Sequence, residues 1–190
     1  RYLRRAEKDD ALALAQLINL AGEGMPLHIW RSMAGEGESV WDVGQRRARR
    51  EEGSFSYRNA TIAMSGKEIA GALVGYPIGG APEAIDRDTP ALFVPLIELE
   101  NAALNTWYVN VLATYDRFQR RGFATALLEE AARQARAAGI RQMSIIVTDR
   151  NERAIRLYRK QGFREIEHRP IAKDGWTTDS EHYLLLIKDL

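Results

Sequence analysis

Residues 119–125 read Gln119-Arg120-Arg121-Gly122-Phe123-Ala124-Thr125 and join a predicted strand to a predicted helix. The strand, 107–114, is rich in β-branched and aromatic residues, and the helix, 122–138, carries its apolar residues on one face. A helix N-terminus has unpaired N–H groups and the positive end of the helix dipole. Gly122 and Ala124 allow a close approach of the backbone, and the two arginines add charge, so the stretch favours a phosphate-binding loop.

Two common phosphate loops do not fit this stretch. No Gly-Lys-Ser/Thr follows, which excludes a Walker loop, and the G-x-G-x-x-G fingerprint of dinucleotide-binding folds is absent. From these residues alone, a plain glycine turn with two solvated arginines is an equal alternative, because short glycine motifs often match by chance.

Hydrophobic periodicity around this loop predicts an α/β order of elements. Helix 7–21 places Leu12, Ala15, Leu17 and Ile18 on one apolar stripe, a short helix lies within 22–37, and 40–52 is a polar helix. The remaining predicted elements are a hairpin (59–76), a loop (77–90), a helix (92–103), a strand (143–148), a helix (151–161) and strands 163–168 and 182–188.

The unit 107–148 must be a right-handed crossover between parallel strands, and hairpins at both ends make the sheet mixed. We therefore expect an α/β fold, a mixed β-sheet with helices on both faces. The length of 190 residues indicates a single domain, 1–190, with two domains as the weaker alternative.

Composition excludes several classes of function. Lys plus Arg (27) nearly cancels Asp plus Glu (26), so no global field gathers nucleic acid or anionic membrane. The run Arg46-Arg47-Ala48-Arg49-Arg50 is followed by Glu51 and Glu52, which is typical of a solvated helix face. The chain has no cysteine and no apolar run of about 20 residues. We expect a cytoplasmic protein without a metal site and without nucleic-acid or membrane partners.

A second motif follows the first at a specific spacing. Gln119-x-x-Gly122-x-Ala124, then a strand, then Asn151-x-x-Ala154-Ile155-x-Leu157-Tyr158-x-Lys160-x-Gly162-Phe163 closely resembles the GNAT superfamily of acyl-CoA-dependent N-acyltransferases. The opening Leu3-Arg4-Arg5-Ala6 and the helix after it resemble that family's first strand and helix. The resemblance covers most of the chain, 22–53 least, and implies a splay between the two central parallel strands.

The resemblance implies a binding site for acetyl-CoA. The pantetheine arm would pair with strand backbone, and the pyrophosphate would rest on the N–H groups of residues 120–125. Asn151 would contact the arm, although an N-cap role comes first for it from the residues alone. The implied contacts are Leu112, Ala113, Thr114, Gln119, Arg120, Arg121, Gly122, Phe123, Ala124, Thr125, Asn151 and Ala154.

Tyr158 shares a helical stripe with Asn151 and Ala154, at spacings of seven and four residues. By resemblance Tyr158 is the general acid that protonates, or hydrogen-bonds, the departing thiolate. A phenol pKa of about 10 lies close to a thiol pKa of about 8.5, so that hydrogen bond can be shared. A core tyrosine with a satisfied hydroxyl is the alternative. The backbone N–H of Leu112 is the candidate donor to the oxyanion.

The general base departs from the family pattern. Many relatives carry a glutamate on the splayed strand, where this chain reads Tyr108-Val109-Asn110. Others carry it shortly before the motif that begins at Asn151, where this chain has Ile146. Catalysis must then use water ordered by Asn110, or an acid from elsewhere: Glu23, Glu98 or Glu100. Glu23 ranks first because its loop forms the acceptor wall in this family, although a solvated loop glutamate is its alternative. His28 and His168 are equally eligible as the base, although a surface or packed histidine is the more common case for each.

The expected function is transfer of an acetyl group from acetyl-CoA to a primary amine by direct attack. No metal and no covalent intermediate are implied, since the chain lacks cysteine and a Gly-x-Ser-x-Gly elbow. A non-catalytic acyl-CoA-binding or sensing module is the main alternative, and a protein-binding scaffold is the third. The sequence does not define the amine acceptor. Homodimers are common among relatives, and nothing in this sequence fixes that state.

Overall fold

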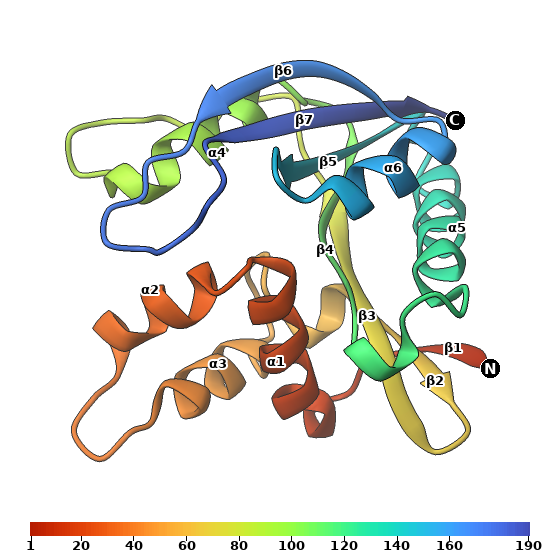
Figure 1. The fold of residues 1–190 in the computed structure, drawn as a ribbon, viewed down its shortest axis with the longest axis horizontal. Helices are drawn as coiled ribbons and strands as arrows, with labels where there is room; N and C mark the ends of the chain where they lie inside the picture. Colours follow the sequence, from red (N-terminus) through yellow and green to blue (C-terminus); the bar gives the residue numbers. More distant parts are fainter. The chain divides into compact units, whose positions relative to one another are not determined.

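The computed structural model describes residues 1–190, and the loop 119–125 lies between strand β4 (Trp107–Thr114) and helix α5 (Phe123–Ala137), as predicted (Figure 1). The predicted face of α5 is buried. It consists of Phe123, Leu127, Leu128, Ala131 and Ala135. Gly139 follows the helix with φ +73°, a left-handed conformation that ends helices at low cost for glycine. The strand, the loop and the helix therefore form where the sequence predicts them.

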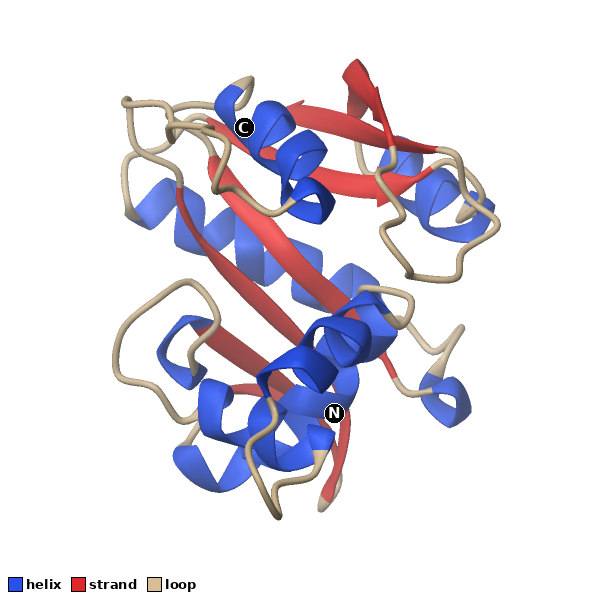
Figure 2. Cartoon of the chain, turned by 90° about the vertical axis from the view of Figure 1, so that its left-hand side faces the viewer, coloured by secondary structure: helices blue, strands red, loops and turns tan.

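The chain divides into two compact units by its internal contacts. The first unit contains Arg1–Tyr76 and Asn110–Ala131, and the second contains Pro77–Val109 and Ala132–Leu190. In each unit helices (blue in Figure 2) accompany strands (red), so neither unit belongs to an all-α or all-β class.

The first unit is built on the antiparallel strands β1 (Tyr2–Arg5), β2 (Ala60–Ser65) and β3 (Glu68–Pro77). Residues 110–114 of β4 lie beside β3. The amide of Tyr115 donates to Ala70 O (2.9 Å), and a Cβ on Gly71 would stand 2.5 Å from Ala113 O. The 3₁₀ turn η1 (Lys8–Asp10) leads into the helices α1 (Ala11–Ala21), α2 (Met25–Met33) and α3 (Val40–Ala48). Two more 3₁₀ turns are η2 (Tyr57–Asn59) and η4 (Asp116–Phe118).

Two sequence predictions in this unit are corrected. Leu12 does not lie on the buried stripe of α1. It is 46% exposed and points about 100° away from Ala11. The buried residues of α1 are Ala11, Leu14, Ala15, Leu17 and Ile18, so the other three predicted members of the stripe are confirmed. The polar helix predicted over 40–52 ends at Ala48, and the side chain of Arg50 donates through Nε to the carbonyl of Arg47 in its last turn (3.1 Å).

The second unit contains β5 (Gln142–Thr148), β6 (Arg164–Pro170) and β7 (His182–Asp189). Trp107–Val109 of β4 run parallel to Met143–Ile145 of β5, and β7 lies antiparallel between β5 and β6. Its helices are α4 (Val94–Asn101), which follows the 3₁₀ turn η3 (Ala91–Phe93) and packs against β6 and β7, and α6 (Glu152–Lys160).

The hydrogen-bonded strand order is β1-β2-β3-β4-β5-β7-β6. A parallel pair stands among antiparallel pairs, which confirms the predicted mixed sheet of an α/β fold. The splay beyond Val109 and the single-domain organisation stay predictions. None of the helices has both the length and the apolar content needed to span a bilayer.

Candidate functional site

The start of α5 carries free amide groups. Arg120 and Gly122 both adopt left-handed conformations, with φ of +61° and +83°. The first helical hydrogen bond runs from Ala126 N to Gly122 O (3.1 Å), so the N–H groups of residues 123–125 have no acceptor inside the helix. Together with the helix dipole, these N–H groups form an arrangement that binds anions.

Guanidinium groups surround this helix start. Arg117 and Arg121 lie over the ring of Phe118, at 4.9 and 5.2 Å from its centroid. Arg1 Nη1 donates to Arg121 O (2.8 Å). Arg120 and Arg121 are exposed and so remain available to an anionic ligand. Gln119 is held locally, since its Nε2 donates to Asp116 Oδ1 (3.2 Å).

Strand β4 has one covered face and one open face over residues 110–114. Val111 and Ala113 are buried, whereas Asn110 is exposed and Leu112 and Thr114 are partly exposed. Glu23, the sequence's first choice for the base, lies in the loop between α1 and α2 with φ +52°. The loop 119–125, residues 112–114, Asn110 and Glu23 therefore all belong to the first unit.

The second motif lies in the second unit. Asn151 is the N-cap of α6, and its Oδ1 accepts a hydrogen bond from Ala154 N (3.4 Å). The predicted capping role is thus confirmed. The side-chain NH₂ of Asn151 has no part in the cap, so a ligand contact by that group stays compatible with it.

Tyr158 is buried, with 6% of its surface exposed, and its ring packs against Phe163 at a centroid distance of 5.9 Å. Burial raises the pKa of Tyr158 above its ordinary value, and no hydrogen bond to the hydroxyl counteracts this. Every fully buried side-chain oxygen in the protein has a hydrogen-bond partner. The Tyr158 hydroxyl has no partner, so it is not fully buried and keeps some access to solvent. It is a protonated donor without a partner, which argues against a core tyrosine with a satisfied hydroxyl.

Glu100 is one of the three acids that the sequence offers as a base, with Glu23 and Glu98. It lies in the last turn of α4 and is partly buried. Burial raises the pKa of Glu100 to about 7, the neighbouring charge of Glu83 adds to the rise, and a hydrogen bond from Tyr108 opposes it. One sequence feature could have drawn attention to it. Glu98 and Glu100 stand near a helix C-terminus whose last turn contains no basic residue, and the helix dipole disfavours negative charge there.

The histidines are weaker candidates for an acid or a base than Glu100 and Tyr158. His168 and His182 lie edge to face, with centroids 5.8 Å apart, and His182 Nδ1 is 3.4 Å from Asp149 Oδ2. His182 is 44% exposed in its side chain. This geometry orients His182 and gives His168 no hydrogen-bonded acid of its own.

Comparison with known proteins adds the family. The model of the acetyltransferase (GNAT) family matches residues 27–163. A crystal structure of an acetyltransferase is 22% identical, with a TM-score of 0.68 over 100% of this chain and 99% of that chain. An N-acetyltransferase from Staphylococcus aureus Mu50 is 17% identical, with a TM-score of 0.64 over 98% of this chain and 100% of that chain.

A GNAT family acetyltransferase from Elizabethkingia anophelis, with acetyl-CoA bound, is 20% identical, with a TM-score of 0.52 over 69% of this chain and 75% of that chain. No curated protein matches the sequence. The solved structures share the fold. The matched region contains the loop 119–125 together with Asn151, Ala154 and Tyr158. With 27–163 covering well over half of its length, the chain belongs to the acetyltransferase (GNAT) family, a family of enzymes.

Proposed function

We propose that the protein transfers the acetyl group of acetyl-CoA directly to a primary amine. Family membership supports acetyl transfer, and the Elizabethkingia anophelis relative is a structure with acetyl-CoA bound. The observation that carries the proposal is the start of α5, where positive φ at Arg120 and Gly122 precedes three free amide groups. A diphosphate is the kind of anion that this arrangement accommodates.

Each residue of the two motifs receives one role in binding. The N–H groups of residues 120–125 hold the pyrophosphate, and Arg120 and Arg121 add positive charge. Gln119 is the first residue of this loop. The backbone of Leu112, Ala113 and Thr114 pairs with the pantetheine arm. Asn151 donates its NH₂ to the same arm, and the small side chain of Ala154 leaves room for it.

The reaction involves the acceptor amine, the backbone N–H of Leu112 and the hydroxyl of Tyr158. The amine nitrogen attacks the thioester carbonyl carbon, and the N–H of Leu112 donates to the oxygen that becomes negative. The carbon–sulfur bond then breaks, and the Tyr158 hydroxyl donates to the departing sulfur. Because burial raises the pKa of Tyr158, its acidity is further from that of a thiol than in water. Tyr158 therefore acts by hydrogen bonding to the thiolate more than by complete proton transfer.

A non-catalytic acyl-CoA-binding or sensing module is the second candidate. It is favoured by one observation, that the Tyr108–Asn110 segment of β4 carries no carboxylate. Calorimetry with acetyl-CoA and a free-thiol release assay over an amine panel separate the candidates. An enzyme binds and releases thiol, a sensor binds only, and a scaffold gives no heat at millimolar acetyl-CoA.

Tyr158→Phe tests the chemical step. We expect turnover to fall by about 10²-fold, because one hydrogen bond to the charge that develops on sulfur is lost, with the Kd for acetyl-CoA changed less than about twofold. Tyr57→Phe is the matched control, since its hydroxyl bonds Glu51 (2.8 Å) on the surface and turnover should not change. Full turnover in Tyr158→Phe removes Tyr158 from this role.

A further inference from the structure

The side chain of Arg1 lies against the start of α5, although 120 positions separate Arg1 from Arg121 in the sequence. Its Nη1 donates to Arg121 O (2.8 Å), and its guanidinium group stands 5.8 Å from the centre of the Phe123 ring. The backbone beside Arg1 is held in place, because β1 pairs with β2 from Tyr2 onward. All of these residues belong to the first unit.

Gly122 leaves room for this guanidinium group. A Cβ at position 122 would stand 2.7 Å from Arg1 Nη1, which is closer than a Cβ normally approaches another atom. The φ of +83° already favours glycine at this position, and the contact with Arg1 is a separate reason for it. Arg1 Nη1 therefore lies beside the residue at which α5 begins and after which the three free amide groups follow.

Positive charge gathers at this point without a carboxylate to balance it. Arg1 and Arg121 stand 5.8 and 6.0 Å from the centre of the same Phe123 ring. Arg117 is paired with Glu68 (3.0 Å), whereas Arg1 and Arg121 form no ion pair. Like charges held close together repel one another, so an anion that joins them is bound favourably.

The guanidinium group of Arg1 keeps most of its hydrogen-bonding capacity. One of its N–H groups is directed to Arg121 O, and the protein offers the others no acceptor. Arg1 is exposed, so these N–H groups are open to a ligand. Arginine suits phosphate in particular, because two of its N–H groups can bond two oxygens of one phosphate.

We propose that Arg1 binds the diphosphate of acetyl-CoA together with the loop 119–125. This assignment rests on the proposed acetyl transfer. The bond from Arg1 Nη1 to Arg121 O holds the guanidinium group at the loop, and its remaining N–H groups donate to phosphate oxygens. The loop supplies amide groups from the start of α5, and Arg1 supplies a positive charge from the residue that precedes β1.

The test is calorimetric titration of Arg1→Ala with acetyl-CoA. An exposed ionic contact is lost, so the Kd should rise about fivefold. Arg5→Ala is the matched control, because Arg5 lies on β1 and its guanidinium group also donates to a backbone carbonyl, that of Arg58. Arg5→Ala removes the same charge and should change the Kd by less than about twofold. An unchanged Kd in Arg1→Ala, or an equal rise in both variants, overturns the assignment.

Coenzyme A carries a further phosphate group on its ribose, and 3′-dephospho-acetyl-CoA lacks that group but keeps the diphosphate. Arg1→Ala should weaken binding of this ligand by the same factor. A weakening confined to acetyl-CoA shows that Arg1 binds the ribose phosphate, and it overturns the assignment to the diphosphate. A wild-type protein that binds neither ligand overturns the proposed function itself, whereas wild-type binding with an unchanged Kd in Arg1→Ala overturns only the role of Arg1.

The contact with Gly122 gives a second test. A methyl group at position 122 would displace Arg1 Nη1, so Gly122→Ala should weaken acetyl-CoA binding in part by moving Arg1 away from the loop. That part is already lost in Arg1→Ala. The double variant should therefore bind more tightly than the product of the two single effects predicts. Single effects that multiply fully in the double variant, measured on folded protein, overturn the assignment.

Discussion

Burial acts on two ionisable residues of the second unit with different consequences. Tyr158 and Glu100 both have a pKa raised mainly by loss of hydration, because burial disfavours the charged form of each. For the phenol this keeps the proton in place and makes a lasting donor. For the carboxyl group it moves the titration into the neutral range, where a group can exchange protons during a reaction.

The first prediction concerns stability and pH. The pKa of Glu100 is about 7 in the folded protein and 4.5 ordinarily, so the folded state holds one more proton between these values. The contribution of Glu100 to the free energy of unfolding is therefore highest below about pH 4.5. It falls as pH rises through about 7, because the carboxyl group must then ionise in its partly buried place. Glu100→Gln should therefore gain up to about 3 kcal/mol over wild type between pH 4.5 and pH 8 in urea unfolding. A stability difference that does not change with pH, or the same gain in Glu98→Gln, contradicts this.

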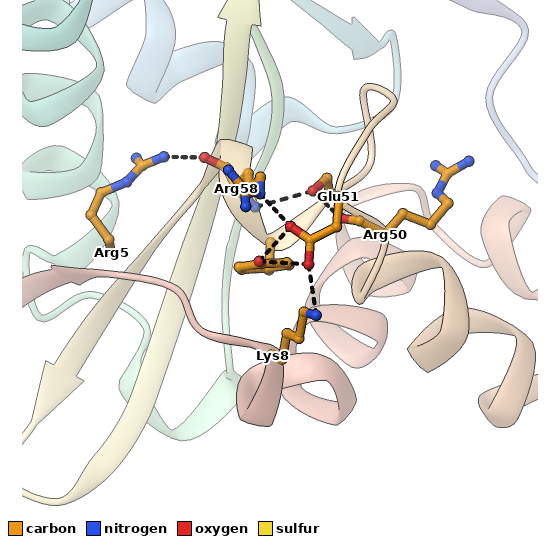
Figure 3. A network of polar contacts seen from close by, with 7 residues as sticks. Arg5, Lys8, Arg50, Glu51 and Arg58 are labelled. Carbon is orange, nitrogen blue, oxygen red and sulfur yellow. Dashed lines mark hydrogen bonds and ion pairs between the residues drawn. The ribbon is translucent and has the colours of Figure 1, made fainter.

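At the scale of elements, the segment that follows α3 is held by one carboxylate. Glu51 accepts from Lys8 Nζ (2.6 Å), Arg58 Nε (2.5 Å) and the Tyr57 hydroxyl (2.8 Å), as Figure 3 shows. Arg5 donates to Arg58 O, and Arg50 donates to Phe55 O (2.8 Å). These contacts join η1, the segment 49–59 and β1, and they explain why the polar helix need not continue to residue 52.

The second prediction tests that network. Lys8, Tyr57 and Arg58 lower the pKa of Glu51 to about 2, so its stabilising effect is present above pH 4.5 and is lost as pH falls toward 2. Glu51→Gln should lower Tm slightly at pH 7, less so in high salt because the groups are exposed. Differential scanning calorimetry at pH 7 and pH 3 measures this, with exposed Glu52→Gln as the control that should leave Tm unchanged. An equal Tm change at both pH values argues against the network.

The third prediction concerns the loop before α5. Gly122 (φ +83°) and Gly139 (φ +73°) flank the same helix in the same conformation, which valine resists. Gly122→Val and Gly139→Val should both lower Tm, and only Gly122→Val should weaken acetyl-CoA binding, by tenfold or more, because Gly122 belongs to the anion loop. Calorimetric Kd values for folded variants decide this. Equal Kd values for the two would place the diphosphate elsewhere.

At the scale of the whole molecule, a ligand that binds only the folded chain stabilises it by mass action. The fourth prediction is that acetyl-CoA at 100 times its Kd raises the unfolding free energy by about 2.7 kcal/mol. For a chain of this size that corresponds to a Tm rise of roughly 5–10 °C. A thermal melt over a range of acetyl-CoA concentrations measures it. Desulfo-CoA keeps the diphosphate and should retain most of the shift, whereas adenosine alone should give little.

The sequence by itself determined the elements and the loop. Strand 107–114, the helix after Gly122 and the N-cap at Asn151 follow from periodicity and from glycine and asparagine chemistry, which neighbouring residues carry. The error at Leu12 has the same origin. Ala15, Leu17 and Ile18 of the predicted stripe are buried, but Leu12 lies at its edge, where local spacing does not decide between core and solvent.

Only the tertiary structure decided which acid stands out. The sequence does not distinguish Glu23, Glu98 and Glu100. Glu100 differs because it is partly buried and because Glu83 and Tyr108, on other elements of the fold, act on its charge. The free hydroxyl of Tyr158 is likewise a product of packing. A pKa depends on hydration and on charges through space, and the folded chain alone sets both.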